Sequence, residues 1–252
     1  MRWPVAVTLG VVGYLAFLLI SLPAQQVVGW IADSGAAPGL RLEGPSGTAW
    51  EGKARNLIYR NRPLGELAWN FRPGYLLLGK LAYAFELKDS GQQASGTLLA
   101  GVGGDYRLEE LDALLLASRL PELLQQNQVR VGGKVSAKQL ALSFEENQVT
   151  AAEGTVEWLD GSLQSPLNLS IGDLRAELTT DPDSGDITGQ VRDIKGAIGV
   201  QAEVRLKADG NFQLDGKLKP GDDADPGLTG ALQAVGRQQS DGTILVKYSG
   251  RI

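Results

Sequence analysis

The chain opens with a long apolar segment. Pro4–Leu22 carries no charge, and Val5–Leu22 would span about 27 Å as a helix at about 1.5 Å per residue. That length is close to the thickness of the hydrocarbon core of a bilayer. Arg2 precedes the segment and Asp33 is the first charged residue after it. The positive-inside rule therefore predicts a cytoplasmic N-terminus at 1–4, a transmembrane helix at 5–22, and a location outside the cytoplasm for the remainder, beginning with a juxtamembrane spacer at 23–38.

A cleaved signal peptide is the alternative interpretation of this segment. The apolar run is longer than a usual signal-peptide core, and Leu22 stands where a small residue is needed for cleavage before Ala24. These two features favour a retained anchor. The pattern of 24–34 also predicts a short amphipathic helix on the outer face of the membrane.

Beyond residue 38 the dominant hydrophobic period is two, which is typical of strands. The clearest run is 80–88, where Leu81, Tyr83, Phe85 and Leu87 fall on one face; a turn at 89–91 and a strand at 92–102 follow. A second clean run at 198–206 precedes Asp209-Gly210 and predicts a hairpin over 197–219. Shorter alternating runs predict strands at 40–43, within 47–79, at 135–144 and at 243–248. We therefore expect residues 39–252 to form a large, mostly antiparallel β domain.

One segment departs from this period. In 106–126, Leu108, Leu111 and Leu115 follow helical spacing and acidic residues occupy the first turn. The pattern predicts a short helical segment near 106–126, interrupted at Pro121.

A single helix of that length covers only part of a sheet of ten or more strands. The sheet must then fold into a sandwich or curve into an open trough with an apolar interior. In a trough, the predicted groove-lining residues are Leu81, Tyr83, Phe85, Leu87, Val200, Val204 and Leu206. An apolar trough beside a membrane favours a lipid or an amphipathic segment as ligand.

Composition excludes several kinds of chemistry. The sequence has no cysteine and no histidine, which removes disulfides, Cys/His zinc sites and Ser-His-Asp triads. A net charge of −5 does not favour nucleic acid. Acidic turns at 181–186 and 222–225 lack the spacing of an EF-hand, and we interpret them as solvated turns. We expect no catalytic, cofactor or metal site.

The stretch from Gly47 to Gly79 carries the most distinctive motifs. They are Gly47-x-x-Trp50-x-Gly52, then Leu64-Gly65-x-Leu67-x-Trp69, then a proline followed by Leu76-Leu77-Leu78-Gly79. The simplest interpretation of the tryptophans is that they are packing anchors of a small sheet. In this order, the motifs also resemble the type II secretion system protein N family.

The resemblance implies a function. It implies a non-enzymatic inner-membrane component of a Gram-negative type II secretion system, which assists the assembly or function of the machinery that exports folded periplasmic proteins across the outer membrane. Its partners would be other inner-membrane and periplasmic subunits. The family also looks related to AsmA-like periplasmic β proteins, so the alternative is a membrane-anchored lipid-handling β trough.

A second motif echoes the first. Gly154-Thr-Val-Glu-Trp158 repeats the pattern of Gly65-Glu-Leu-Ala-Trp69. A weak internal duplication is one explanation, with copies at 39–128 and 129–252.

Overall fold

The computed structural model describes residues 3–34, 39–101, 103–120, 130–145, 148–165, 169–221, 230, 232 and 236–251. The chain divides into two compact units, Met1–Gln93 and Ala94–Ile252. Both are built mainly from antiparallel strands, as the hydrophobic period predicts.

The first unit begins with two helices, α1 (Trp3–Ile20) and α2 (Ala24–Ser34). The predicted helix at 24–34 is confirmed. Within the described residues, no helix combines the length and the apolar character that a membrane crossing requires.

Five strands complete the first unit. They are β1 (Leu40–Glu43), β2 (Ser46–Gly47), β3 (Glu51–Tyr59), β4 (Arg62–Phe71) and β5 (Lys80–Asp89). The order is β1-β3-β4-β5, with β2 paired to β3. Arg60 and Asn61 form the two-residue loop between β3 and β4, and both have positive φ (48° and 66°). This is the type I′ geometry that matches the twist of a hairpin. A 3₁₀ helix, η1 (Pro73–Leu78), joins β4 to β5.

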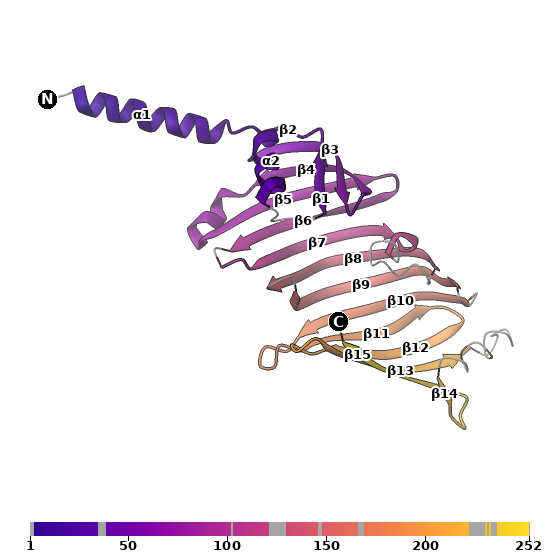
Figure 1. Ribbon diagram of the computed structural model, residues 1–252. Helices are drawn as coiled ribbons and strands as arrows, with labels where there is room; N and C mark the ends of the chain where they lie inside the picture. Colours follow the sequence, from indigo (N-terminus) through magenta and orange to yellow (C-terminus); the bar gives the residue numbers. More distant parts are fainter. Residues whose placement is uncertain are drawn as a thin grey trace. The chain divides into compact units, whose positions relative to one another are not determined.

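The second unit contains the remaining strands, apart from the first two residues of β6. They are β6 (Gln92–Gly101), β7 (Tyr106–Leu116), β8 (Arg130–Glu145), β9 (Gln148–Ser165), β10 (Leu169–Thr180), β11 (Ile187–Lys195), β12 (Ile198–Leu206), β13 (Asn211–Pro220), β14 (Arg237–Gln238) and β15 (Ile244–Arg251). Strands β6 to β13 lie in sequence order and are followed by β15 and β14 (Figure 1). Within the described part of this unit they make one hydrogen-bonded sheet. The prediction of a large, mostly antiparallel sheet is confirmed, and the choice between a sandwich and an open trough stays a prediction.

The prediction of a helical segment near 106–126 is wrong for residues 106–116. Residues 106–116 are strand β7, followed by a single 3₁₀ turn, η2 (Ala117–Arg119), while 121–129 lie outside the described residues. The register against β8 shifts between Leu108 and Leu111, and Glu110 there has a positive φ of 53°. Such a β-bulge inserts an extra residue and changes the spacing of inward-facing leucines from two to three. The three-residue spacing of the leucines resembles the spacing of a helix, which is why the sequence pattern predicted one here.

The sheet of the second unit has an apolar face with a core at one end. Residues opposite one another on neighbouring strands share a face. One such row consists of Val156, Ala176, Val191, Ala202, Gly216 and Val246. The core cluster beside this row contains Leu169, Ile198, Val200, Leu232 and Ile244, of which Ile244 is fully buried.

The opposite face of the same sheet is polar and carries a buried carboxylate. Glu157 on β9 is only 6 % exposed. It accepts hydrogen bonds from Lys138 Nζ at 3.0 Å and from the Arg175 guanidinium at 2.6 Å. These two cations hold the pKa of Glu157 below its ordinary value. The cluster ties β8, β9 and β10 together across the polar face.

We expect Glu157→Gln to lower the free energy of unfolding at neutral pH by roughly 1 kcal/mol, because the charge-assisted hydrogen bonds to Lys138 and Arg175 are lost. The loss is this small because both cations are half exposed, so that solvent screens their interaction with the carboxylate. A lowered folded-state pKa stabilises the protein above the unfolded-state pKa, and that stabilisation is lost as the pH falls through the folded-state pKa. The difference between wild type and variant should therefore shrink below about pH 4.

Urea denaturation of the full-length protein in detergent, repeated across this pH range, measures the effect. The matched control is Glu177→Gln, which removes an exposed partner of Arg192 (3.2 Å) and should change stability by less than about 0.5 kcal/mol. An equal loss in both variants, or a pH-independent loss in Glu157→Gln, would contradict the assignment.

Candidate functional site

The end of helix α1 is bound to the edge of the first unit's sheet. The indole Nε1 of Trp50 donates to the carbonyl oxygen of Leu19 at 2.7 Å. The backbone N–H of Ala49 donates to the carbonyl oxygen of Leu22 at 2.8 Å, and Pro23 forms a bridge with Thr48. Ala24, the first residue of α2, is buried at 1 % exposure. We call this set, Leu19–Ala24 with Thr48–Trp50, the tryptophan junction.

Trp69 supports the junction from the neighbouring strand. Its Nε1 donates to the carbonyl oxygen of Thr48 at 3.2 Å. Gly52 lies opposite Trp69, and a Cβ atom on Gly52 would be 2.5 Å from the indole ring and 2.5 Å from the Ser46 carbonyl oxygen. Gly47 pairs with Gly52 at a φ of +90°, where L residues are strained. The two glycines of the first motif therefore leave the space that the Trp69 ring occupies beside the turn.

The rest of the motif shapes the strands that carry the tryptophans. Gly65 has a φ of +114° at an irregularity between β3 and β4, and its N–H donates to the Asn56 side chain at 3.2 Å. Leu64 and Leu67 are partly buried on β4. Gly79 ends η1 in the left-handed conformation, with a φ of +68°.

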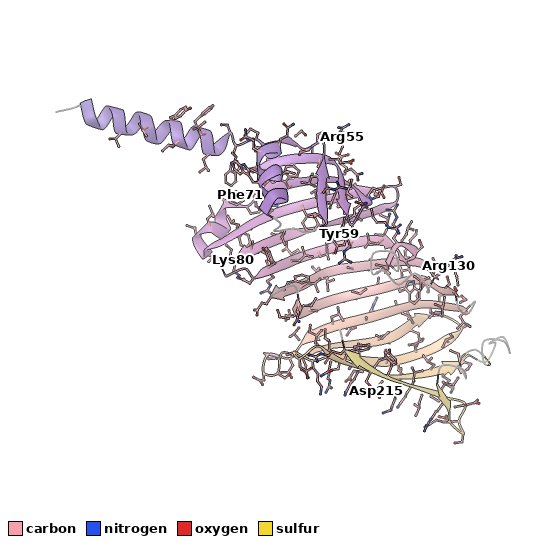
Figure 2. The ribbon with its side chains drawn as sticks, in the orientation of Figure 1. Arg55, Tyr59, Phe71, Lys80, Arg130 and Asp215 are labelled. Carbon is pink, nitrogen blue, oxygen red and sulfur yellow. The ribbon has the colours of Figure 1, made fainter. Side chains whose placement is uncertain are left out.

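An aromatic ladder continues from the junction across the sheet. The ring centroids of Trp50 and Phe71 are 4.9 Å apart, and those of Phe71 and Tyr83 are 5.2 Å apart. Figure 2 labels Phe71 on this ladder. Burial raises the pKa of the Tyr83 hydroxyl.

The predicted groove residues belong to two different units. On β5, Tyr83, Phe85 and Leu87 stand opposite Phe71, Trp69 and Leu67, so they share the aromatic face, whereas Leu81 is 49 % exposed. On β12 of the other unit, Val200 belongs to the core, and Val204 and Leu206 are partly exposed. Their role in binding a ligand stays a prediction.

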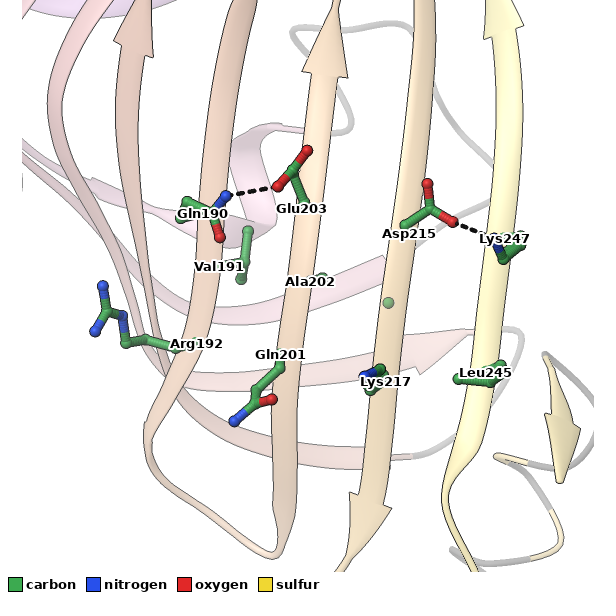
Figure 3. A pocket seen from close by; sticks show the side chains of 11 residues that line it. Gln190, Val191, Arg192, Gln201, Ala202, Glu203, Asp215, Lys217, Leu245 and Lys247 are labelled. Carbon is green, nitrogen blue, oxygen red and sulfur yellow. Dashed lines mark hydrogen bonds and ion pairs between the residues drawn. The ribbon is translucent and has the colours of Figure 1, made fainter. Parts of the chain in front are cut away.

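A shallow pocket of about 640 Å³ lies on the polar face of the second unit (Figure 3). Gln190 donates to Glu203 at 2.7 Å and Lys247 pairs with Asp215 at 2.9 Å on its floor. These four polar groups bind one another, while Arg192, Gln201 and Lys217 also line the pocket.

In the described ranges, no group of three acidic residues converges as a metal site would require. Asp181 Oδ1 accepts the backbone N–H groups of Asp183 and Ser184, each at 2.9 Å, which closes the turn. These bonds lower the pKa of the Asp181 carboxyl. The second acidic turn, 222–225, lies outside the described residues.

Trp158 repeats part of this arrangement in the second unit. Its Nε1 donates to the carbonyl oxygen of Gly132 at 2.9 Å. It follows Gly154 (φ +133°) by four residues, as Trp69 follows Gly65. The boundary between compact units, at 93/94, differs from the 128/129 division of the predicted duplication, which stays a prediction.

Comparison with known proteins gives the family. The model of the family "Type II secretion system (T2SS), protein N" matches residues 38–247, which include every motif described above. The chain belongs to this family. The family resemblance inferred from the tryptophan motifs is thereby confirmed.

Three curated relatives, each named "Type II secretion system protein N", support the assignment. The protein from Aeromonas hydrophila is 27% identical over 247 residues, covering 96% of this chain and 95% of the relative. The protein from Vibrio cholerae serotype O1 is 26% identical over 207 residues (81% and 80%), and that from Klebsiella pneumoniae is 25% identical over 248 residues (94% and 91%). No solved structure matches this chain significantly.

The sequence marks the tryptophans and glycines of the motifs, but it does not mark the atoms that accept the tryptophan hydrogen bonds. The acceptors are backbone carbonyls of Leu19 and Thr48, which no residue type marks. It also did not identify Glu157. In the sequence, the one sign of this buried carboxylate is that Glu157 is the only acidic residue within the strand segment 154–158.

We expect Gly52→Ala to destabilise the first unit by about 1–3 kcal/mol, because the new methyl group overlaps the Trp69 ring and the Ser46 carbonyl. The matched control is Gly74→Ala, since nothing lies within 4 Å of a Cβ there and the expected change is within about 0.5 kcal/mol. Chemical denaturation followed by tryptophan fluorescence measures both. Equal stabilities of the two variants would show that Gly52 does not position Trp69.

Proposed function

We propose that this protein is a non-enzymatic component of a type II secretion system, held in the inner membrane of a Gram-negative cell. Residues 1–4 are cytoplasmic, 5–22 form the anchor, 23–38 connect it, and 39–252 are periplasmic. The family match over 38–247 carries the proposal. The family's printed description names the secretion system.

The anchor rests on the sequence and on the character of α1. Val5–Leu22 is uncharged, and side chains such as Tyr14, Phe17 and Ile20 are more than 60 % exposed on the helix. Apolar side chains exposed at this density need a nonaqueous environment or a partner. A bilayer supplies that environment, and other inner-membrane subunits can pack against the same surface.

The periplasmic part offers an open strand edge to further subunits. Strand β14 pairs with β15 only through Arg237–Leu245 and Gln238–Ile244. Within the described residues, the backbone from Val246 to Arg251 has no strand partner on that side. An unpaired edge can accept a strand from another protein through backbone hydrogen bonds.

A lipid-handling role is the alternative, and the comparisons favour the secretion component over it. The relatives are named for the secretion system, and one of the predicted groove residues, Val200, is only 7 % exposed in the core. An experiment can separate the two roles.

Gentle-detergent purification of the full-length protein from its native inner membrane should recover other secretion subunits, identified by mass spectrometry with the bound lipids. A parallel purification of an unrelated single-pass inner-membrane protein gives the background. Enrichment of stoichiometric lipid with no secretion subunit above background would reverse the order of the two functions.

A further inference from the structure

The loop between β4 and β5 exposes three consecutive leucines. Leu76, Leu77 and Leu78, all in η1, are 51, 92 and 71 % exposed. The loop is nevertheless well fixed. Arg72 N–H donates to the Ala82 carbonyl at 2.8 Å, and Gly79 N–H donates to the Leu76 carbonyl at 3.0 Å. A short fixed loop that presents leucines outward costs solvation free energy in water, so it favours an apolar environment.

The charged residues that flank this leucine loop in the sequence are both positive. From Glu66 to Glu86 the sequence has no other acidic residue, and its charged residues are Arg72 and Lys80, one at each side of η1. Neither forms an ion pair with an acidic side chain in the described part of the chain. Figure 2 labels Lys80 at the base of the loop. Leucines flanked by cations match a bilayer surface, where acyl chains lie beneath anionic headgroups.

The loop also lies at the same end of the sheet as the end of α1. Trp50, bound to the Leu19 carbonyl, immediately precedes β3, and its own carbonyl accepts the N–H of Phe71 at 2.6 Å. Phe71 is the last residue of β4 and leads directly into η1. Because neighbouring strands are about 4.8 Å apart, the base of the loop lies within about 10 Å of the junction with α1.

We propose that the leucine loop, 72–80, is a second membrane contact, which inserts Leu76–Leu78 into the outer interface of the bilayer that α1 spans. The inference rests on the proposed anchor. Two contacts at one end of the first unit fix its orientation to the membrane, whereas a single helix leaves it free to tilt.

The absence of cysteine makes a direct test simple. Single variants Leu77→Cys, Ser90→Cys and Leu15→Cys are made in the full-length protein and labelled with the environment-sensitive dye NBD. Each is reconstituted into vesicles of phosphatidylethanolamine and phosphatidylglycerol, with and without lipids carrying a nitroxide quencher on the acyl chain. Ser90 is the matched control, since it is exposed at the other end of β5.

We expect blue-shifted emission and quenching at positions 77 and 15, with neither at position 90. Replacing phosphatidylglycerol by phosphatidylcholine, or introducing Arg72→Gln with Lys80→Gln, should reduce the quenching at position 77 and leave position 15 unchanged.

Quenching at 15 but not at 77 would overturn the leucine-loop contact and leave the anchor standing. A blue shift at 77 without quenching would also overturn it, because the leucines would then be buried against protein. No quenching at 15 would overturn the anchor, and the loop contact would then be judged by position 77 alone.

Discussion

The arrangement of the first unit depends on two backbone carbonyls, that of Leu19 in the last turn of α1 and that of Leu22 just beyond it. Once a helix ends, its last carbonyl groups need donors from outside the helix. Here Trp50 donates to Leu19 and the backbone of Ala49 donates to Leu22, at 2.7 and 2.8 Å. The helix end is therefore bound to the sheet by directional bonds, and the aromatic ladder from Trp50 to Tyr83 continues from that point into β4 and β5.

Glycine makes this contact possible. Trp69 reaches the Thr48 carbonyl because Gly52 leaves room beneath its ring, and Gly47 adopts the positive φ that turns β2 against β3. The family motif thus describes a packing arrangement with a mechanical consequence. It fixes where an apolar helix leaves a β unit, and so sets the direction in which that helix leaves the sheet.

The sequence predicted the strands well wherever alternation is undisturbed, as in β5 and in the hairpin of β12 and β13. It failed at β7, where a bulge at Glu110 changes the spacing of the leucines, and a bulge leaves no reliable mark in one sequence. The site was predicted in part. Trp50, Trp69 and the glycines carry the motif, but their backbone acceptors and the exposure of Leu77 depend on the three-dimensional arrangement.

The measurement that tests this account most directly is amide-resolved hydrogen exchange on the full-length protein in lipid nanodiscs. The tryptophan junction requires the N–H of Ala49 to be held by the Leu22 carbonyl. Its exchange should therefore be far slower than that of an unstructured peptide, and Trp50→Phe, which removes the bond to Leu19, should accelerate it. Exchange of Ala49 at the unstructured rate in the wild-type protein would contradict the account, because α1 would then be joined to the sheet by a flexible connection.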